Sequence, residues 1–246
     1  MLAIIGGSNL TRLSNMDVLE RRVTRTPYGD PSGVLSFGRI YGQNILFLPR
    51  HGYAHSIPPH RVNYRANIWA LKECGARRVI SVASVGGIRP DLNPGDIVIP
   101  HQIVDYTWGR ANTYHDGGDM PVMHVDFTHP YDEELRKKLV LAANAAGIAI
   151  RDGGVYAATQ GPRLETAAEI DRLERDGAAV VGMTGMPEAA LARELDLAYA
   201  ALNPVANHAA GRGQSADGVH FARLGEILQE AMSRVRAIIE GVIRLS

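Results

Sequence analysis

The sequence predicts an α/β fold in which a sheet is covered by helices on both faces. Short apolar runs rich in Val, Ile and Ala alternate along the chain with segments of helical periodicity, which is typical of strands buried under helices. The 246 residues are 46% hydrophobic and contain no internal repeat, charge block or low-complexity tract. Because α/β folds of about 200 to 250 residues routinely form one domain, we expect residues 1–246 to be a single domain.

The strands are predicted from short runs of β-branched and small apolar residues that are bounded by turn-forming residues. Their short length distinguishes them from the longer segments with a helical period. The predicted strands are residues 2–5, 44–48, 78–82, 96–99, 155–158, 178–182 and 197–202.

The helices are predicted at residues 62–74, 130–146, 164–175, 187–195 and 219–243. Pro130 suits a first helical position, Glu133 follows in the first turn and Gly147 supplies a stop. In the last segment, apolar residues recur at i, i+3 and i+4 spacing. One stripe of this helix therefore faces the core.

Composition excludes several classes of function. The 26 Lys and Arg side chains balance the 26 Asp and Glu side chains, so the chain lacks the basic surplus that nucleic-acid binding requires. No run approaches the about 18 uninterrupted apolar residues of a membrane span, and the apolar start lacks the basic region of a signal peptide. The single Cys74 can form neither an internal disulfide nor a cysteine metal site, and we interpret it as a core residue. We expect a cytoplasmic protein without a nucleic-acid or membrane partner.

Polar and glycine-rich segments follow several of the predicted strands. Open α/β sheets bind ligands beyond the carboxyl ends of their strands. Backbone N–H groups and hydroxyls bind oxyanions there, and an arginine guanidinium can grip a tetrahedral oxyanion bidentately. Each segment alone is also compatible with an ordinary turn, but together they predict a pocket for inorganic phosphate. The segments are Gly6-Gly7-Ser8, Arg50-His51-Gly52, Ser84 with Gly86-Gly87, and Thr184 before Pro187-Glu188.

The histidines do not form a metal motif. His51, His55 and His60 lie close together in sequence, but Gly52 and the Pro58-Pro59 pair prevent a regular helix from presenting them on one face. No acidic residue intervenes to complete a helical zinc motif. We therefore expect no catalytic metal.

Glu165 and Asn203 are two further polar candidates. Glu165 lies in a predicted first helical turn, where an acidic residue commonly stabilises the helix. Asn203 ends the strand predicted at residues 197–202, where a turn residue is common. From the residues alone, the interpretation ends at an anion site beside an α/β sheet.

A set of segments forms a recognisable signature from residue 4 to beyond residue 200. They are Ile4-Ile5-Gly6-Gly7-Ser8, Leu48-Pro49-Arg50-His51-Gly52, residues 62–72, Pro94-Gly95-Asp96-Ile97-Val98-Ile99, Gly161-Pro162-Arg163, and Met183-Thr184 followed by Pro187-Glu188. With these segments the sequence resembles the trimeric purine nucleoside phosphorylases, and most closely their methylthioadenosine phosphorylase branch. The resemblance covers nearly the whole chain.

The resemblance implies a single-domain mixed sheet flanked by helices, of the nucleoside phosphorylase type, and a homotrimer with active sites near subunit boundaries. It implies phosphorolysis of a purine nucleoside to base and pentose 1-phosphate, with phosphate as co-substrate and no other cofactor. By position, Met183 falls under the sugar, and His124 falls where relatives contribute a residue to the neighbouring subunit's site. His55 is expected beside the substrate. The positions implied to hold phosphate are Ser8, Arg50, His51, Ser84 and Thr184.

Departures from the adenine-specific relatives indicate the base. Those relatives place Asp at the positions of Asn203 and Val205, whereas members acting on 6-oxopurines place Asn at the first position and Glu at the position of Glu165. An Asn amide can donate to O6 and accept from N7–H, and a Glu carboxylate can accept from N1–H, a proton that adenine lacks. The resemblance thus implies that Asn203 and Glu165 are catalytic and select hypoxanthine. Leu164 stands where relatives stack a Phe on the base, and Ala83 where they have a phosphate-side Thr.

The 5′ end of the substrate is implied by Phe221 and Leu224, which fall approximately where methylthioadenosine phosphorylases line an apolar pocket. His220 beside them matches a His that binds the 5′-hydroxyl in enzymes for ordinary nucleosides. The combination implies cleavage of S-methyl-5′-thioinosine to hypoxanthine and 5-methylthioribose 1-phosphate. The alternatives are a general inosine and guanosine phosphorylase, a methylthioadenosine phosphorylase, a nucleosidase, a nicotinamide-dependent oxidoreductase and a non-catalytic nucleoside-binding protein.

Overall fold

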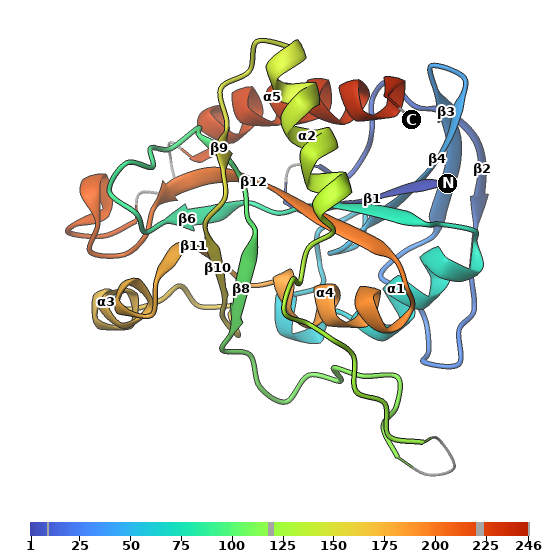
Figure 1. The fold of residues 1–246 in the computed structure, drawn as a ribbon, viewed down its shortest axis with the longest axis horizontal. Helices are drawn as coiled ribbons and strands as arrows, with labels where there is room; N and C mark the ends of the chain where they lie inside the picture. The colour runs from blue at the N-terminus through green and yellow to red at the C-terminus, as the bar shows by residue number, and fades with distance from the viewer. Residues whose placement is uncertain (9, 118–120, 220–223, 246) are drawn as a thin grey trace.

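The fold is an α/β arrangement built on one mixed sheet, seen in the computed structural model of the chain (Figure 1). The structure describes residues 1–246 except 9, 118–120, 220–223 and 246. Among the described residues, the sheet has 12 strands: β1 (Leu2–Gly6), β2 (Asp17–Arg22), β3 (Leu35–Ile40), β4 (Gln43–Pro49), β5 (Arg78–Val82), β6 (Val85–Gly87), β7 (Ile97–Ile99), β8 (Gln102–Asp105), β9 (Arg151–Asp152), β10 (Val155–Ala158), β11 (Ala178–Gly182) and β12 (Ala198–His208). The helices are α1 (Tyr64–Glu73), α2 (Glu133–Ala145), α3 (Ala167–Arg175), α4 (Gly185–Glu194) and α5 (Leu224–Arg244), with 3-10 turns η1 (Pro59–Arg61) and η2 (Gly213–Ser215).

The sheet contains two parallel groups that meet at β6, and at one edge β3 pairs antiparallel with β4 and β2 pairs antiparallel with β3. Its order is β2-β3-β4-β1-β5-β12-β6-β11-β10-β8, and β7 pairs with β12 and β9 away from this path. In the first group β4, β1, β5 and β12 are parallel, and in the second β11, β10 and β8 are parallel. β6 is parallel to β12 and antiparallel to β11, so the two groups run in opposite directions. The mixed sheet predicted from the sequence is therefore confirmed.

Helices cover both faces of the sheet. Successive strand residues point to opposite faces, and apolar residues on both faces must be buried. In β1, Ala3 and Ile5 belong to the core cluster that contains Ile68 of α1, whereas Leu2 and Ile4 belong to a second cluster, beneath α2 and α5. Figure 1 shows α1 and α4 on one side of the sheet and α2 and α5 on the other. Strands buried on both sides appear in the sequence as continuous apolar runs, and all the strands predicted from such runs are present.

The sequence does not predict β2, β3, β6, β8 or β9. β2 is exposed along its whole length and carries the polar sequence Asp-Val-Leu-Glu-Arg-Arg. Such an edge strand has no buried face, so it leaves no apolar pattern to detect. β6, β8 and β9 have only three, four and two residues.

Side-chain caps set the starts of three helices later than predicted. The Asn63 side chain accepts a hydrogen bond from the Ala66 backbone N–H at the start of α1. Asp132 caps α2 in the same way, so Pro130 lies outside that helix. Thr166 forms a capping box with Glu169, and α3 begins at Ala167. Glu165 therefore lies in the loop before α3 and is not part of its first turn.

β12 is longer than the sequence predicts and changes partners midway. It pairs with β5 up to Leu202, with β7 at Asn203 and Pro204, and with β6 from Val205. Because the strand exchanges neighbours around Pro204, this proline does not end it. Asn203 is consequently an interior strand residue.

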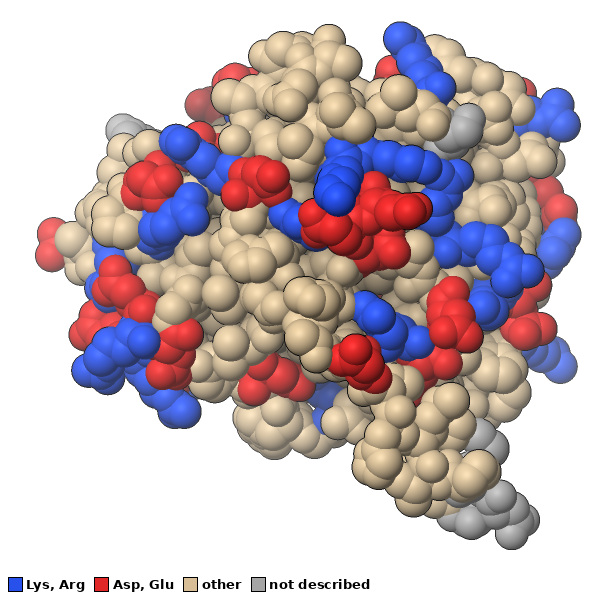
Figure 2. Space-filling view, in the orientation of Figure 1, with Lys and Arg blue, Asp and Glu red and all other residues tan. Residues whose placement is uncertain are grey.

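The surface carries both signs of charge. Figure 2 shows basic and acidic side chains interspersed on one face of the molecule, in keeping with the zero formal net charge of the sequence. Within the part of the chain that the structure describes, no helix is long and apolar enough to cross a membrane.

Candidate active site

A cavity of about 890 Å³ lies at the ends of strands from both parallel groups. Its walls include residues that follow β1, β4, β5 and β11, together with Ala206 and Asn207 near the end of β12. The segments predicted from strand ends are thus brought together across the junction at β6. The predicted site residues that line this cavity are Ser8, Arg50, His51, His55, Ser84, Leu164, Glu165, Met183 and Thr184.

Several hydroxyl side chains and a close-packed glycine turn line the cavity. The Ser84 hydroxyl is buried without a hydrogen-bond partner among the described residues, and Ser8 Oγ lies 3.4 Å from His55 Nε2. Thr184 precedes α4, where its side chain makes no capping bond. A Cβ on Gly7 would stand 2.6 Å from the Val82 carbonyl, so only glycine lets the backbone pass this close. Such a lining can bind an oxyanion.

Arg50 forms the buried floor of the cavity. Its Nε and Nη2 donate to the two carboxylate oxygens of Glu188 at 2.7 and 2.9 Å, and both side chains are fully buried. Nη2 also donates to Ser81 Oγ at 2.6 Å and Nη1 donates to the Val82 carbonyl at 2.9 Å. Since a guanidinium has five N–H donors, one Nη1–H is left without a partner among the described residues. The bidentate partner of Arg50 is therefore Glu188, and the predicted bidentate grip on phosphate is wrong.

His51 is held as a neutral ring. Its Nδ1 lies 2.8 Å from the Ile57 carbonyl oxygen, which can only accept, so Nδ1 carries the proton and Nε2 is an acceptor. Burial and the charge of Arg50 lower the pKa of His51 to about 4, although the bond to Ile57 opposes this shift. A neutral His51 can accept a hydrogen bond from a protonated phosphate oxygen but supplies no charge.

We predict that His51 stays neutral over the physiological pH range. Because its folded pKa of about 4 lies below the ordinary 6.5, the unfolded chain binds more protons between these values. The stability that His51 contributes is fully present above about pH 6.5 and is lost as the pH falls toward 4. Ring-nitrogen NMR across this interval measures the pKa directly. A His51 ring that titrates near 6.5 in the folded protein would contradict the assigned environment.

Glu165 and Met183 line another part of the cavity. Thr159 Oγ1 donates to Glu165 Oε1 at 2.6 Å, which fixes the carboxylate and leaves Oε2 for another donor. Met183 packs closely against Gly161 in the turn before Glu165. A Cβ added to Gly161 would lie only 2.4 Å from the Met183 sulfur. The neighbouring Leu164 is 40% exposed.

Asn207, and not Asn203, lies at the cavity wall. Asn203 is 1% exposed, donates through Nδ2 to the Ala83 carbonyl at 2.8 Å and does not line the cavity. The resemblance implied a base-binding role for Asn203 because it matched this residue to an Asp of the adenine-specific relatives. Asn207 lies near the true end of β12 and lines the cavity. The apolar pair Val205-Ala206 after Pro204 was the signal in the sequence that the strand continued.

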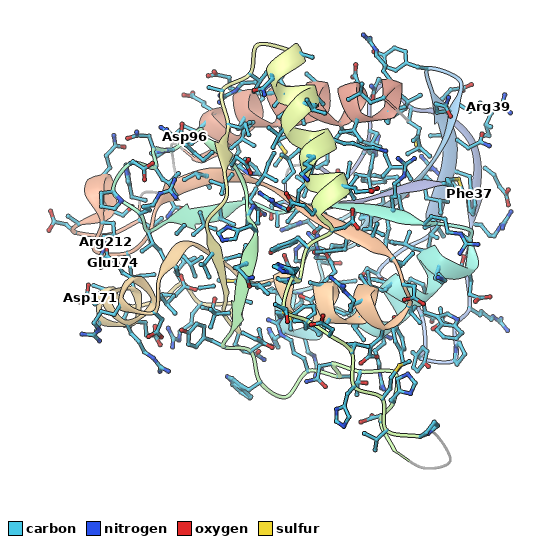
Figure 3. All side chains as sticks on the ribbon, in the orientation of Figure 1. Phe37, Arg39, Asp96, Asp171, Glu174 and Arg212 are labelled. Carbon is cyan, nitrogen blue, oxygen red and sulfur yellow. The ribbon has the colours of Figure 1, made fainter. Side chains whose placement is uncertain are left out.

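Ion pairs outside the cavity hold its wall to α3. Figure 3 shows Arg212, which follows β12, beside Asp171 and Glu174 of α3. One Arg212 nitrogen, Nη2, donates to Asp171 Oδ1 and Glu174 Oε2, each at 2.7 Å. This connects the segment after β12 to the helix that follows Glu165.

The other predicted site residues lie elsewhere. His124 is exposed and does not line this chain's cavity. Phe221 lies outside the described residues, as do His220 and the side chain of Leu224. Within the described ranges, no group of three or more His, Cys, Asp or Glu side chains could hold a metal ion.

Comparison with known proteins gives a consistent set of relatives. The family model described as "Phosphorylase superfamily" matches residues 2–244. A Pseudomonas syringae protein named "Probable S-methyl-5'-thioinosine phosphorylase" is 50% identical over 99% of this chain and 98% of its own length. The 6-oxopurine nucleoside phosphorylase of Pyrococcus furiosus is 43% identical over 99% and 92%. Among solved structures, methylthioadenosine phosphorylase from Schistosoma mansoni with adenine is similar, with a TM-score of 0.94, 32% identity and coverage of 99% and 91%.

Proposed function

The chain belongs to the phosphorylase superfamily, and on that premise we propose that it cleaves a 6-oxopurine nucleoside with inorganic phosphate. The observation that carries the proposal is a single cavity that combines hydroxyls with two base-recognising groups. Ser8, Ser84 and Thr184 supply the hydroxyls, and Glu165 and Asn207 supply a carboxylate and an amide. The products are a purine base and a pentose 1-phosphate, and phosphate is the only co-substrate.

The preference for a 6-oxopurine follows from hydrogen-bond chemistry. Glu165 can accept from N1–H of hypoxanthine, and adenine has no proton there. The Asn207 amide can donate to O6 and accept from N7–H of the departing base. A 6-aminopurine would leave the Glu165 carboxylate without a donor at N1 and the Asn207 N–H without an acceptor at position 6, which a site of this kind penalises.

The proposed mechanism forms one bond and breaks one. A phosphate oxygen attacks C1′ while the C1′–N9 bond breaks and its electron pair passes to the purine, which takes a proton from solvent at N7. The sugar passes through an oxocarbenium-like state that the phosphate charge stabilises. Asn207 and Glu165 stabilise the charge that develops on the base. Arg50 contributes its one remaining N–H to phosphate, and Glu188 balances its charge.

The 5′ substituent is proposed to be methylthio. Val219, which precedes α5, and Gly225 and Leu228, in its first two turns, line the cavity and offer no polar side chain for a 5′-hydroxyl. Several relatives carry the name "Probable S-methyl-5'-thioinosine phosphorylase". The Pyrococcus furiosus relative favours a second candidate, a general 6-oxopurine nucleoside phosphorylase.

Product analysis tests this proposal. We expect phosphate-dependent hypoxanthine release, followed by chromatography, to be faster from S-methyl-5′-thioinosine than from inosine. Release from S-methyl-5′-thioadenosine should be slow because Glu165 finds no donor at N1. Base release without phosphate would indicate a nucleosidase. Preference for the 6-amino substrate would refute the assignment of the base.

A homotrimer is proposed as the working assembly. The segment between β8 and α2 exposes Trp108 and Val122 by 73% and 78% and Met123 by 50%. Contiguous exposed apolar side chains commonly mark protein interfaces, and Val122 and Met123 are consecutive and directly precede His124. Light scattering should give a mass of three chains, and a monomer would refute this assembly. The cytoplasmic location expected from the sequence stays a prediction.

A further inference from the structure

Arg110 lies outside the cavity but touches two segments that line it. It belongs to the segment between β8 and α2, is half-buried and does not line the cavity itself. Nη1 donates to the carbonyls of Met183 and Met186 at 2.8 and 2.6 Å. Nη2 donates to the carbonyls of Thr159 and Gln160 at 3.3 and 2.8 Å. The guanidinium thus bridges the start of α4 to the turn that leads to Glu165.

The arrangement around Arg110 is unusual for a half-buried cation because its partners are dipoles. No carboxylate of a described residue lies within ion-pair distance of it. Besides the four carbonyls, Nε donates to the Gln160 side-chain oxygen at 3.1 Å and Nη1 to the Tyr64 hydroxyl at 3.3 Å. The guanidinium carbon also lies 5.4 Å from the centre of the Tyr64 ring. This geometry serves to fix backbone positions and does not balance an acidic group.

The geometry points to Arg110 as a positioning residue that sets the placement of Glu165 and Met183 relative to each other, and thereby the discrimination between 6-oxo and 6-aminopurines. This inference rests on the proposed function. The two segments already touch, since Gly161 packs on the Met183 sulfur. Arg110 joins them with its two terminal nitrogens, one for each segment. A small displacement of Glu165 would separate its carboxylate from N1–H, and misplacement by about 1 Å can cost about 100-fold in rate.

Lysine cannot replace Arg110 in this role. A lysine ammonium is a single nitrogen, whereas the planar guanidinium presents separate donors on a rigid fork. Arg110→Lys should keep the positive charge and lose the bridge. Arg65→Lys is the matched control, because Arg65 is also half-buried and bonds the same loop at the Thr113 carbonyl and Asp116, but contacts neither active-site segment.

The activity test compares two substrates on each variant. For Arg110→Lys we expect kcat/KM for S-methyl-5′-thioinosine to fall about 100-fold. The ratio of kcat/KM for this substrate to that for S-methyl-5′-thioadenosine should fall about tenfold, because recognition by one hydrogen bond is lost. Arg65→Lys should stay within about threefold of the parent in both measures. Equal losses on both substrates, with an unchanged ratio, would show that Arg110 only maintains folded protein and would overturn the inference.

Hydrogen exchange provides a measurement that does not depend on turnover. In Arg110→Lys, amides in residues 159–165 and 183–187 should exchange faster than in the parent, and in Arg65→Lys they should not. Unchanged exchange in either segment would overturn the positioning role. If the unsubstituted protein releases no base, the proposed function is refuted. The exchange test would still show whether Arg110 orders the two segments, because it does not depend on turnover.

A milder variant covers the case in which Arg110→Lys does not fold. Gln160→Leu removes the oxygen that accepts from Arg110 Nε and from the Trp108 backbone N–H, each at 3.1 Å, and leaves the guanidinium and its four carbonyl partners. We expect the substrate ratio and the exchange rates to change in the same direction by about threefold. A folded Gln160→Leu protein with both measures unchanged would count against the inference.

Discussion

Asn207→Ala should lower kcat/KM for S-methyl-5′-thioinosine by about 100- to 1,000-fold, the usual effect of removing one donor to a developing negative charge. Asn207 is half-buried at the cavity wall, where its side chain donates to the His208 carbonyl at 2.6 Å. Because this site is only half-buried, water can replace the amide at the His208 carbonyl, so the folded protein should lose little stability. Steady-state kinetics and thermal unfolding measure the two effects separately.

Asn203 provides the matched control because it is also an asparagine of β12. Asn203→Ala removes a buried hydrogen bond to the Ala83 carbonyl, so the free energy of unfolding should fall by about 1–2 kcal/mol. Its ratio of 6-oxo to 6-amino activity should be unchanged. Asn207→Asp should shift that ratio toward the 6-aminopurine, since a carboxylate can accept from N6–H but cannot donate to O6. Kinetic loss in Asn203→Ala with none in Asn207→Ala would restore Asn203 as the base-binding residue.

Glu188→Gln is expected to have the largest effect on stability. It leaves the fully buried Arg50 guanidinium without its counter-charge, and breaking a buried ion pair costs about 3–5 kcal/mol. Ser81 and Tyr199 also donate to Glu188 Oε1, at 2.6 and 2.8 Å. Tyr199→Phe removes one neutral partner, so it should cost only about 1–2 kcal/mol. Urea unfolding at neutral pH measures the difference, and equal losses for the two variants would contradict a charge effect.

The same ion pair makes acid stability depend on Glu188. Burial alone would raise the pKa of this carboxyl, but the charge and hydrogen bonds of Arg50, with those of Ser81 and Tyr199, outweigh burial and lower it below the ordinary 4.5. The stabilisation is therefore present above pH 4.5 and is lost as the pH falls through the lower folded value. The Glu188→Gln protein should lack this part of the acid transition.

A double replacement separates folding from phosphate binding. Exchanging a buried ion pair for apolar residues of similar size is often neutral or stabilising, so Arg50→Met with Glu188→Leu should recover much of the stability lost in Glu188→Gln. The KM for phosphate should nevertheless rise, because the free Nη1–H of Arg50 is gone. Recovery of both properties would show that Arg50 contributes nothing to phosphate binding.

The sequence by itself determined the elements that have a strong local pattern. Each strand predicted from an apolar run is present in the structure. The polar residues that follow these strands, from Ser8 to Thr184, line the cavity. This succeeded because burial on both faces of a strand imposes a continuous apolar run. The side chains at the strand ends are then brought together wherever those strands meet.

Only the tertiary structure decided the roles that depend on distant partners. Glu188 is 138 residues from Arg50, so no local pattern shows that it takes the guanidinium. Asn207, and not Asn203, lines the cavity because β12 exchanges β5 for β7 and β6 around Pro204 and continues to His208. Arg110 bonds carbonyls 49 to 76 residues away, and carbonyls belong to every residue type. Periodicity records which face of an element is buried, but the choice among polar partners is made by the packing of whole elements.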